Sequence, residues 1–236
     1  EANPRASRTV PFVSKSTGVP LAKIAARIMA GEKLADLHLP ADDREFDYFC
    51  VKEAVMPFGR FPGSDVVLGP EMKSTGEVMG IAGNFPAAFT KTQLAIDYEP
   101  PRGGEVFISV NDGDKRNITA IARSIARLGF SLVATTGTAR ALRASGIECE
   151  EVGKIHAGSH TILDRIASGE IVLMINTPFG SSTNTDGYEM RAACVRHGVS
   201  YCTTLAGAQA LIAGMEAVRE TGLDVIALQD LPQWEG

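Results

Sequence analysis

The stretch Phe130–Thr138, FSLVATTGT, decides the fold that this sequence predicts. It begins with an apolar run typical of a buried strand and ends in a glycine flanked by threonines, after which the amphipathic segment 139–146 begins. A strand followed by a helix start gathers free backbone N–H groups and hydroxyls, with the positive end of the helix dipole behind them. Such a connection favours phosphate binding, although a threonine-capped strand-to-helix turn without a ligand explains the same residues equally well.

Short apolar runs alternate with helical patterns on both sides of this stretch. The expected strands lie at 106–110, 130–134, 147–152, 171–175 and 199–202, with a further strand at 225–228 closing the sheet. The expected helices lie at 117–128, 139–145, 161–167, 188–196 and 205–220. This alternation predicts the α/β class, with a Rossmann-like parallel sheet covered by helices on both faces.

The sequence before residue 98 has a different pattern. A helix is expected over 20–31, a strand over 46–56, and a helix over 85–96. The segment 97–104, DYEPPRGG, holds two prolines and two glycines and continues neither neighbouring element. We therefore expect an α+β domain over 1–97, a linker over 98–104 and the parallel-sheet domain over 105–236.

Composition excludes several classes of function. The 236 residues carry a net charge of −5 and no polybasic run, which argues against nonspecific binding of nucleic acid. No apolar run approaches the roughly 20 residues that cross a bilayer, so no membrane partner is expected. Four scattered cysteines without CxxC spacing favour reduced thiols in the cytoplasm and no zinc site. Because the chain begins inside a motif, at Glu1, we expect it to be part of a longer protein.

Polar side chains follow four of the expected strands, at the point where each strand ends. Because right-handed crossovers place the carboxyl ends of parallel strands along one edge, we expect these side chains to converge on one crevice. They belong to Asp114, Lys115, Thr135, Thr136, Thr138, Lys154, Asn176 and Thr177, with Gly137 inside the threonine run. Lysines, hydroxyls and an amide suit a phosphorylated ligand, although each lysine alone is explained as a solvated charge and Asn176 and Thr177 as a turn cap.

The amino-terminal segment 1–8, EANPRASR, is a second candidate site. On an extended segment Glu1 and Asn3 project to the same face, giving two oxygen ligands suited to a Mg²⁺ ion that bridges nucleotide phosphates. Arg5 and Arg8 would neutralise phosphate oxygens there. A polar, frayed terminus explains these residues as well.

Several stretches of the first part resemble a known family. They are EANPRASRTVPFVSKSTGVPLAKIAARIMAG at 1–31, VKEAVMPF at 51–58, FPG at 61–63 and LGPEMKSTGEVMG at 68–80. These resemble the end of the second ATP-grasp unit in the large subunit of carbamoyl phosphate synthetases. That family makes carbamoyl phosphate from bicarbonate, glutamine-derived ammonia and two ATP, for arginine and pyrimidine biosynthesis.

The resemblance implies roles for the amino-terminal residues and for partners. Glu1 and Asn3 would be ligands of Mg²⁺ or Mn²⁺ at the ATP site, and Arg5 and Arg8 would be its catalytic phosphate contacts. The glutaminase small subunit and the rest of the large subunit would be the partners. Since most of the family's machinery lies upstream of these stretches, we expect this chain alone to be inactive.

The part after residue 105 resembles the methylglyoxal-synthase-like allosteric domain that ends the same subunit. In the family this domain binds UMP as an inhibitor and IMP as an activator. The positions that match are Lys115, Thr135, Thr138, Lys154, Asn176 and Thr177. Where the family often has a further threonine, this chain has Pro178, which has no hydroxyl to donate, so the choice between UMP and IMP stays open.

The resemblance also implies a site for the activator ornithine and a role in assembly. The positions that match the ornithine site are Glu53, Met56, Tyr201 and Thr203. Without the resemblance, we expect Glu53 to be an exposed charge on a strand, and Tyr201 and Thr203 to pack at the end of a strand. In the family the C-terminal domain supports oligomer contacts, so we expect a homo-oligomer; a pure assembly module is one alternative function.

A lyase is the enzymatic alternative, because methylglyoxal synthases share this fold and eliminate phosphate from dihydroxyacetone phosphate. Proton abstraction next to a carbonyl requires a carboxylate base and usually a histidine. Asp186, His156 and His160 are the candidates near the strand ends. The glycine-glycine-aspartate run associated with the synthases is absent, with Gly158-Ser159-His160 in its place, which argues against this alternative.

Overall fold

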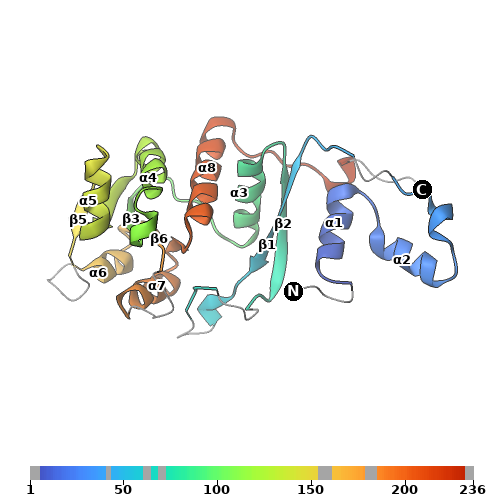
Figure 1. Ribbon diagram of the computed structural model, residues 1–236, viewed down its shortest axis with the longest axis horizontal. Helices are drawn as coiled ribbons and strands as arrows, with labels where there is room; N and C mark the ends of the chain where they lie inside the picture. Colours follow the sequence, from blue (N-terminus) through green and yellow to red (C-terminus); the bar gives the residue numbers. More distant parts are fainter. Residues whose placement is uncertain are drawn as a thin grey trace.

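The computed structural model contains a helix-covered parallel sheet beside a smaller part built of helices and an antiparallel β-ribbon (Figure 1). It describes residues 6–40, 44–60, 65–68, 73–153, 161–178 and 185–231. None of the helices within these ranges is long and apolar enough to span a bilayer.

The parallel sheet confirms the α/β class predicted for the second part. Its strands are β3 (Glu105–Ser109), β4 (Ser131–Thr135), β5 (Glu150–Val152), β6 (Ile171–Asn176) and β7 (Ser200–Cys202). They pair in the order β5-β4-β3-β6-β7, and every pair is parallel. The helices between and after them are α4 (Ile118–Arg127), α5 (Thr136–Ala144), α6 (Ile162–Ala167), α7 (Thr185–His197) and α8 (Leu205–Thr221).

Helices cover both faces of this sheet. Val106 and Ile108 of β3 pack on one face with α4, α5 and α8, whereas Phe107 packs on the other face with α6 and α7. All three side chains are fully buried. Because successive strand residues point to opposite faces, a strand covered on both sides must be apolar throughout, which is the pattern that the sequence shows.

The first part contains more elements than the sequence predicted. They are α1 (Thr9–Thr17), α2 (Leu21–Met29), the 3₁₀ turns η1 (Leu34–Leu37) and η2 (Phe58–Arg60), β1 (Phe49–Val55), β2 (Gly76–Ala82) and α3 (Phe85–Ala95). The predicted α2, β1 and α3 are present, and the Asn84 side chain caps α3 by accepting from the Ala87 amide at 2.9 Å. β1 and β2 form the antiparallel ribbon.

Helix α1 and strand β2 were missed for different reasons. The start of α1, Thr9-Val10, is β-branched and has weak helix propensity, yet Gly18 ends the helix in the left-handed region at φ 71°. Strand β2 contains Gly76 and Gly80, which weaken a strand pattern. The glycine at position 80 is required by tertiary packing, because α3 lies directly against it.

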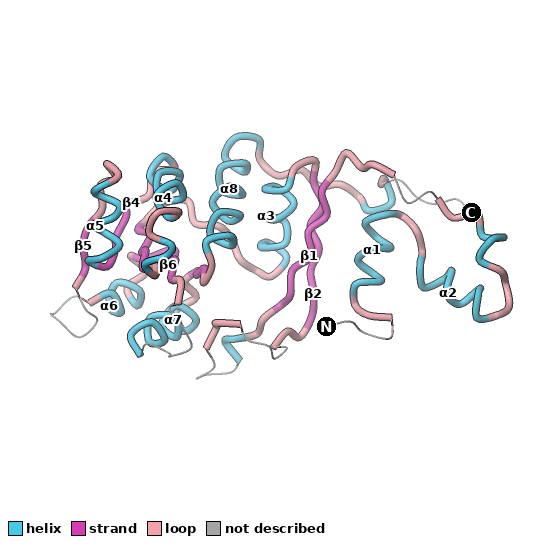
Figure 2. The backbone as a smooth tube through the Cα atoms, in the orientation of Figure 1, coloured by secondary structure: helices cyan, strands magenta, loops and turns pink. Residues whose placement is uncertain are grey.

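Helix α3 packs between the β1–β2 ribbon and α8 (Figure 2). Two glycines permit the close approach on its two sides. A Cβ added at Gly80 of β2 would lie 2.0 Å from the Ala88 carbonyl oxygen, and one added at Gly214 of α8 would lie 2.3 Å from Thr90 Oγ1. The first part therefore packs directly against the second through α3 and α8.

The expected strand at 225–228 is wrong, because β7 is an edge of the sheet and this segment is not a strand. The chain instead leaves α8 and runs back over the ribbon towards α1 (Figure 1). Leu223 packs on the apolar cluster of the ribbon and α3, and Asp224 pairs with Lys91 of α3 at 3.2 Å. These contacts hold the segment away from the sheet, and it ends in the 3₁₀ turn η4 (Leu228–Asp230).

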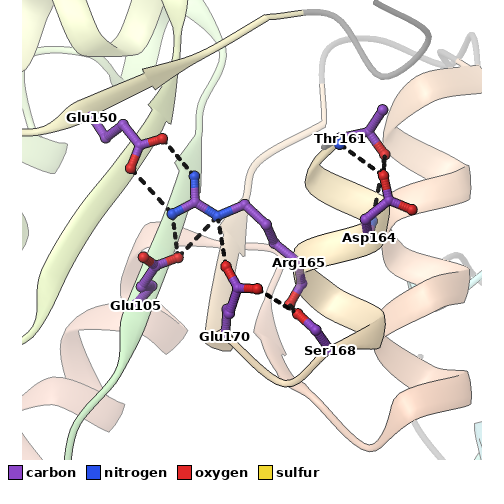
Figure 3. Close-up of polar contacts among 7 residues, drawn as sticks. All are labelled: Glu105, Glu150, Thr161, Asp164, Arg165, Ser168 and Glu170. Carbon is purple, nitrogen blue, oxygen red and sulfur yellow. Dashed lines mark hydrogen bonds and ion pairs between the residues drawn. The ribbon is translucent and has the colours of Figure 1, made fainter. Parts of the chain in front are cut away.

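An ion-pair cluster lies at the amino-end edge of the parallel sheet (Figure 3). Arg165 of α6 contacts Glu105 at the start of β3, Glu150 at the start of β5 at 2.7 Å, and Glu170 just before β6 at 3.5 Å. Its side chain is only 6% exposed. Because the Arg165 guanidinium pairs with carboxylates at the starts of three strands, this cluster fixes α6 against the sheet.

The close contact at Gly80 yields a stability prediction. Gly80→Ala should destabilise the fold by about 1–3 kcal/mol, because the new methyl group overlaps the α3 backbone, which moves less readily than a side chain. Gly83→Ala is the matched control, since a Cβ there meets nothing within 4 Å. Urea unfolding of both variants measures the difference, and equal midpoints would contradict the proposed packing.

Candidate functional site

The carboxyl ends of three central strands meet at Ser109, the last residue of β3. From β4, the Thr135 hydroxyl lies 3.4 Å from the Ser109 hydroxyl. From the β6 side, the Asn176 amide and the Thr177 backbone N–H both donate to the Ser109 carbonyl, at 3.1 and 3.2 Å. The predicted convergence of these strand ends is therefore present in the structure.

The threonine-glycine stretch is the start of a helix rather than a loop. Thr135 is the N-cap of α5 with an extended backbone, and the helix begins at Thr136, three residues before the predicted start. Gly137 and Thr138 therefore lie in its first turn. The Thr135 side chain makes no capping hydrogen bond, so among the described residues the backbone N–H groups of this turn and the positive end of the helix dipole are available to an anion.

The hydroxyls of Thr135, Thr136 and Thr138 already have protein partners, and those of Thr135 are Ser109 and Thr138. Thr138 is only 1% exposed, and its hydroxyl accepts from the Val110 backbone N–H at 3.3 Å and contacts Thr135. The Thr136 hydroxyl hydrogen-bonds the Glu151 carboxylate and holds the pKa of that group below its usual value. Thr138 thus has a structural contact that the sequence did not reveal, since it ties α5 to the end of β3.

Lys115 lies over the first turn of α5. It follows the 3₁₀ turn η3 (Asp112–Asp114), and a Cβ built at Gly137 would lie 2.9 Å from its ammonium nitrogen. A larger residue at Gly137 would therefore displace the ammonium. Lys115 pairs with Asp112, whose side chain is 88% exposed and can turn into solvent when an anion takes its place. A cation and unpaired helix N–H groups thus lie together.

Asn111, which sequence reasoning missed, holds the connection between β3 and η3. Its backbone N–H and its side-chain amide both donate to the Thr177 hydroxyl, at 3.1 and 3.0 Å. The same amide donates to Asp114 at 2.6 Å. Asn111 is a polar residue that directly follows the apolar run of β3. The criterion that selected Asp114, a polar side chain after a strand, therefore applies to Asn111 as well. The Thr177 hydroxyl is therefore engaged in fixing the strand ends.

Arg191 of α7 is a second residue that the sequence did not indicate. Its guanidinium donates to the Asn176 side-chain oxygen at 2.8 Å and to both oxygens of Asp65, at 2.8 and 2.6 Å. Its side chain is 4% exposed. Burial acts to raise the pKa of Asp65, but the hydrogen bonds from Arg191 and two backbone amides outweigh it, and the pKa lies below its usual value.

The amino-terminal site is largely outside the part of the chain that the structure describes. The predicted site residues outside it are Glu1, Asn3, Arg5 and Lys154, together with the lyase candidates His156 and His160. Arg8 is described and pairs with Glu77 of β2 at 3.3 Å. Asp186 lies in the first turn of α7. Within the described residues, no group of three or more His, Cys, Asp or Glu side chains is placed to hold a metal.

Glu53, predicted for the ornithine site, is held by α3. Its carboxylate accepts from the Thr92 hydroxyl at 2.6 Å and from the Gln93 amide. Burial and, after it, the charge of the Glu53 carboxylate raise the pKa of the Cys202 thiol of β7 to about 12. Glu53 is therefore a packed carboxylate rather than a free strand charge.

The other residues of this predicted site are distributed around β7. Tyr201 packs in the core on the α6–α7 face, whereas Cys202 packs on the α8 face. Burial raises the pKa of Tyr201 to about 12, and nearby groups including Asp65 contribute. Met56 follows β1 and Thr203 follows β7, and both are half-buried. Tyr201 and Cys202 therefore lie on opposite faces of the sheet.

Comparisons with known proteins identify the family. The model described as "MGS-like domain" matches residues 117–203, and "Carbamoyl-phosphate synthase L chain, ATP binding domain" matches residues 1–37. The carbamoyl phosphate synthase large chain of Methanothermobacter thermautotrophicus is 50% identical over 236 residues, covering 100% of this chain and 22% of that protein. This chain belongs to the carbamoyl phosphate synthase large-chain family. The resemblance found in the sequence is confirmed.

The match is to the C-terminal part of the family's large chain. The "large chain, C-terminal section" of Methanopyrus kandleri is 51% identical over 236 residues, which are 98% of this chain and 44% of that protein. The chain thus spans less than half the length of these curated relatives. A methylglyoxal synthase structure from Elizabethkingia anophelis covers 48% of this chain and 78% of its own, with a TM-score of 0.39 and 19% identity, a likeness too distant to support an argument.

The Thr138 contact yields a second prediction. Thr138→Val should destabilise the fold by about 1–3 kcal/mol, because it leaves the buried Val110 N–H without a partner while keeping the side-chain volume. Thr119→Val is the control, since the Thr119 hydroxyl bonds at an exposed helix start. Chemical denaturation measures both, and an undiminished stability of Thr138→Val would show that the hydroxyl contact contributes nothing.

Proposed function

We propose that this chain is the C-terminal region of a glutamine-hydrolysing carbamoyl phosphate synthetase large subunit and that its parallel-sheet domain binds a phosphorylated effector. The relatives, about half identical over nearly all of the chain, support the first statement. The observation that carries the second is the placement of the Lys115 ammonium over the uncapped first turn of α5.

The chemistry of this edge favours a phosphate group. Helix N–H groups and the helix dipole attract an anion, and an ammonium adds charge-assisted hydrogen bonds. Asp112 now pairs with Lys115, so a ligand phosphate would replace one anion by another without leaving the lysine unpaired. The Thr135 hydroxyl at the end of β4 is half-buried beside this turn and completes the proposed phosphate contact.

The proposed ligands are nucleoside monophosphates, UMP or IMP, as the family resemblance implies. Asn176 and Thr177 would act mainly by holding the strand ends, because both are buried and bonded to protein atoms. Lys154 would add a second cation. Pro178 is exposed and has no hydroxyl, so the base or ribose must find its polar contacts elsewhere.

The amino-terminal part would complete the ATP site in the full large subunit. There Glu1 and Asn3 would ligate Mg²⁺ or Mn²⁺, and Arg5 and Arg8 would contact phosphate oxygens. These oxygen ligands suit a hard divalent cation, which would offset the phosphate charge. The pairing of Arg8 with Glu77 supports a fixed orientation for its guanidinium. The glutaminase small subunit and the rest of the large subunit are the proposed partners.

Ornithine is the proposed ligand of the region around Glu53, with Met56, Tyr201 and Thr203. The support is a carboxylate oriented by Thr92 and Gln93, because a positioned carboxylate is suited to bind an ammonium group. Homo-oligomer formation, cytoplasmic location and roles in arginine and pyrimidine biosynthesis remain predictions from the resemblance.

A comparison of UMP with uridine tests the phosphate site. UMP should bind on the order of 10-fold more tightly, because hydrogen bonds to charged groups contribute about 1.5–3 kcal/mol and uridine lacks the phosphate. Calorimetry on the purified chain measures both dissociation constants. Equal affinities would refute a phosphate-centred site.

Lys115→Gln should remove most of this preference, since it deletes the cation over α5. Lys91→Gln is the matched control, because Lys91 also pairs with an aspartate but lies on α3, away from the strand ends. A UMP affinity that falls equally in both variants would assign the effect to net charge rather than to the site.

The chain alone should make no carbamoyl phosphate, because the proposed catalytic machinery is mostly in the remainder of a protein more than twice as long. An assay with bicarbonate, glutamine or ammonia, ATP and Mg²⁺ measures the product. Synthesis above the rate without protein would contradict this proposal.

A further inference from the structure

Arg191 joins two parts of the molecule that are far apart in the sequence. One of its partners, Asn176, ends β6 at the proposed effector site. The other, Asp65, lies in the connection between β1 and β2, 126 residues before Arg191. The contact is reinforced by η2 of the same connection, which packs against α7.

The pair of Arg191 with Asp65 is largely buried, with side chains that are 4% and 19% exposed. Both carboxylate oxygens accept from the guanidinium, and Asp65 Oδ1 also accepts from the Val67 backbone N–H at 3.2 Å. Gly187 lies over the contact to Asn176, because a Cβ there would come within 3.0 Å of Arg191 Nη1 and 3.6 Å of the Asn176 oxygen. A lysine has one compact ammonium and cannot reproduce this fork of donors.

We propose that Arg191 is a positioning residue that couples the β1–β2 connection to the effector site. The identity of the effector in this inference rests on the proposed function, whereas the Arg191 contacts are independent of it. Arg191 fixes the Asn176 amide with its oxygen towards α7 and its nitrogen towards the Ser109 carbonyl. Asp65 in turn fixes the direction of the Arg191 guanidinium.

This arrangement links the two regions in both directions. Loss of the Asp65 charge frees the guanidinium, and the Asn176 amide then loses the contact that orients it. The Asn176 amide bonds the end of β3, and the residue after Asn176 bonds Asn111, which begins the turn before Lys115. Because a coupling free energy is reciprocal, a ligand that orders these strand ends also stabilises the Asp65 contact.

Asp65→Asn tests the positioning role without any ligand. The variant keeps the shape but places an amide against the guanidinium, so the NMR signals of the Asn176 side-chain amide and of the Asn111 backbone amide should shift. Glu105→Gln is the matched control, because it weakens the other buried arginine-carboxylate contact, at the opposite edge of the sheet. Unshifted Asn176 signals in a folded Asp65→Asn protein would overturn the inference.

UMP titrations of the same variants test the coupling. Asp65→Asn and Arg191→Lys should weaken UMP binding on the order of 10-fold, whereas Glu105→Gln should leave it unchanged although stability falls. Equal affinity in Asp65→Asn and the unaltered chain would overturn the coupling. If the unaltered chain binds no UMP while Asp65→Asn still shifts the Asn176 signals, the proposed ligand is wrong and the positioning role stands.

Discussion

The structure depends on the parallel pairing of β4, β3 and β6, which places three strand ends side by side. Ser109 ends the middle strand, and its carbonyl accepts hydrogen bonds from the residues that end β6 and follow it. Right-handed crossovers require each connecting helix to begin near this same edge. The polar residues after each strand therefore meet for a reason of topology, although they are up to 66 residues apart in the chain.

The two edges of the sheet differ in how firmly their cations are paired. At the amino ends, the carboxylates of Glu105 and Glu150 surround Arg165, so the cation is fully paired with protein groups. At the carboxyl ends, Lys115 pairs with the exposed Asp112, and the N-cap residue of α5 makes no side-chain cap. The pair at the carboxyl ends is therefore the one that an anion could replace, whereas the buried cluster at the amino ends is closed by protein groups.

Strands that are covered by helices on both faces could be predicted from the sequence. Elements whose residues are chosen to fit one neighbouring segment could not. Strands β3, β4 and β6 are apolar throughout because helices cover both faces, so their pattern is visible. Strand β2 is hidden by Gly80, which is required by the carbonyl of Ala88 on α3. The convergence of Lys115 with Thr135 follows from topology, whereas the Arg191–Asp65 pair depends on how two distant segments pack, and no local pattern encodes it.

The predicted linker at 98–104 concerns how the chain connects its two parts, whereas side-chain packing shows how those parts are held together. Helix α3 precedes the linker, yet it packs on α8 closely enough that a methyl group at Gly214 would meet Thr90. A second contact, from Asp65 to Arg191, crosses between the same two parts at the level of the strand ends. Two separated contacts restrict rotation as well as displacement. A change at the end of β6 therefore has a short physical route to the β1–β2 ribbon, through packed side chains rather than through the linker.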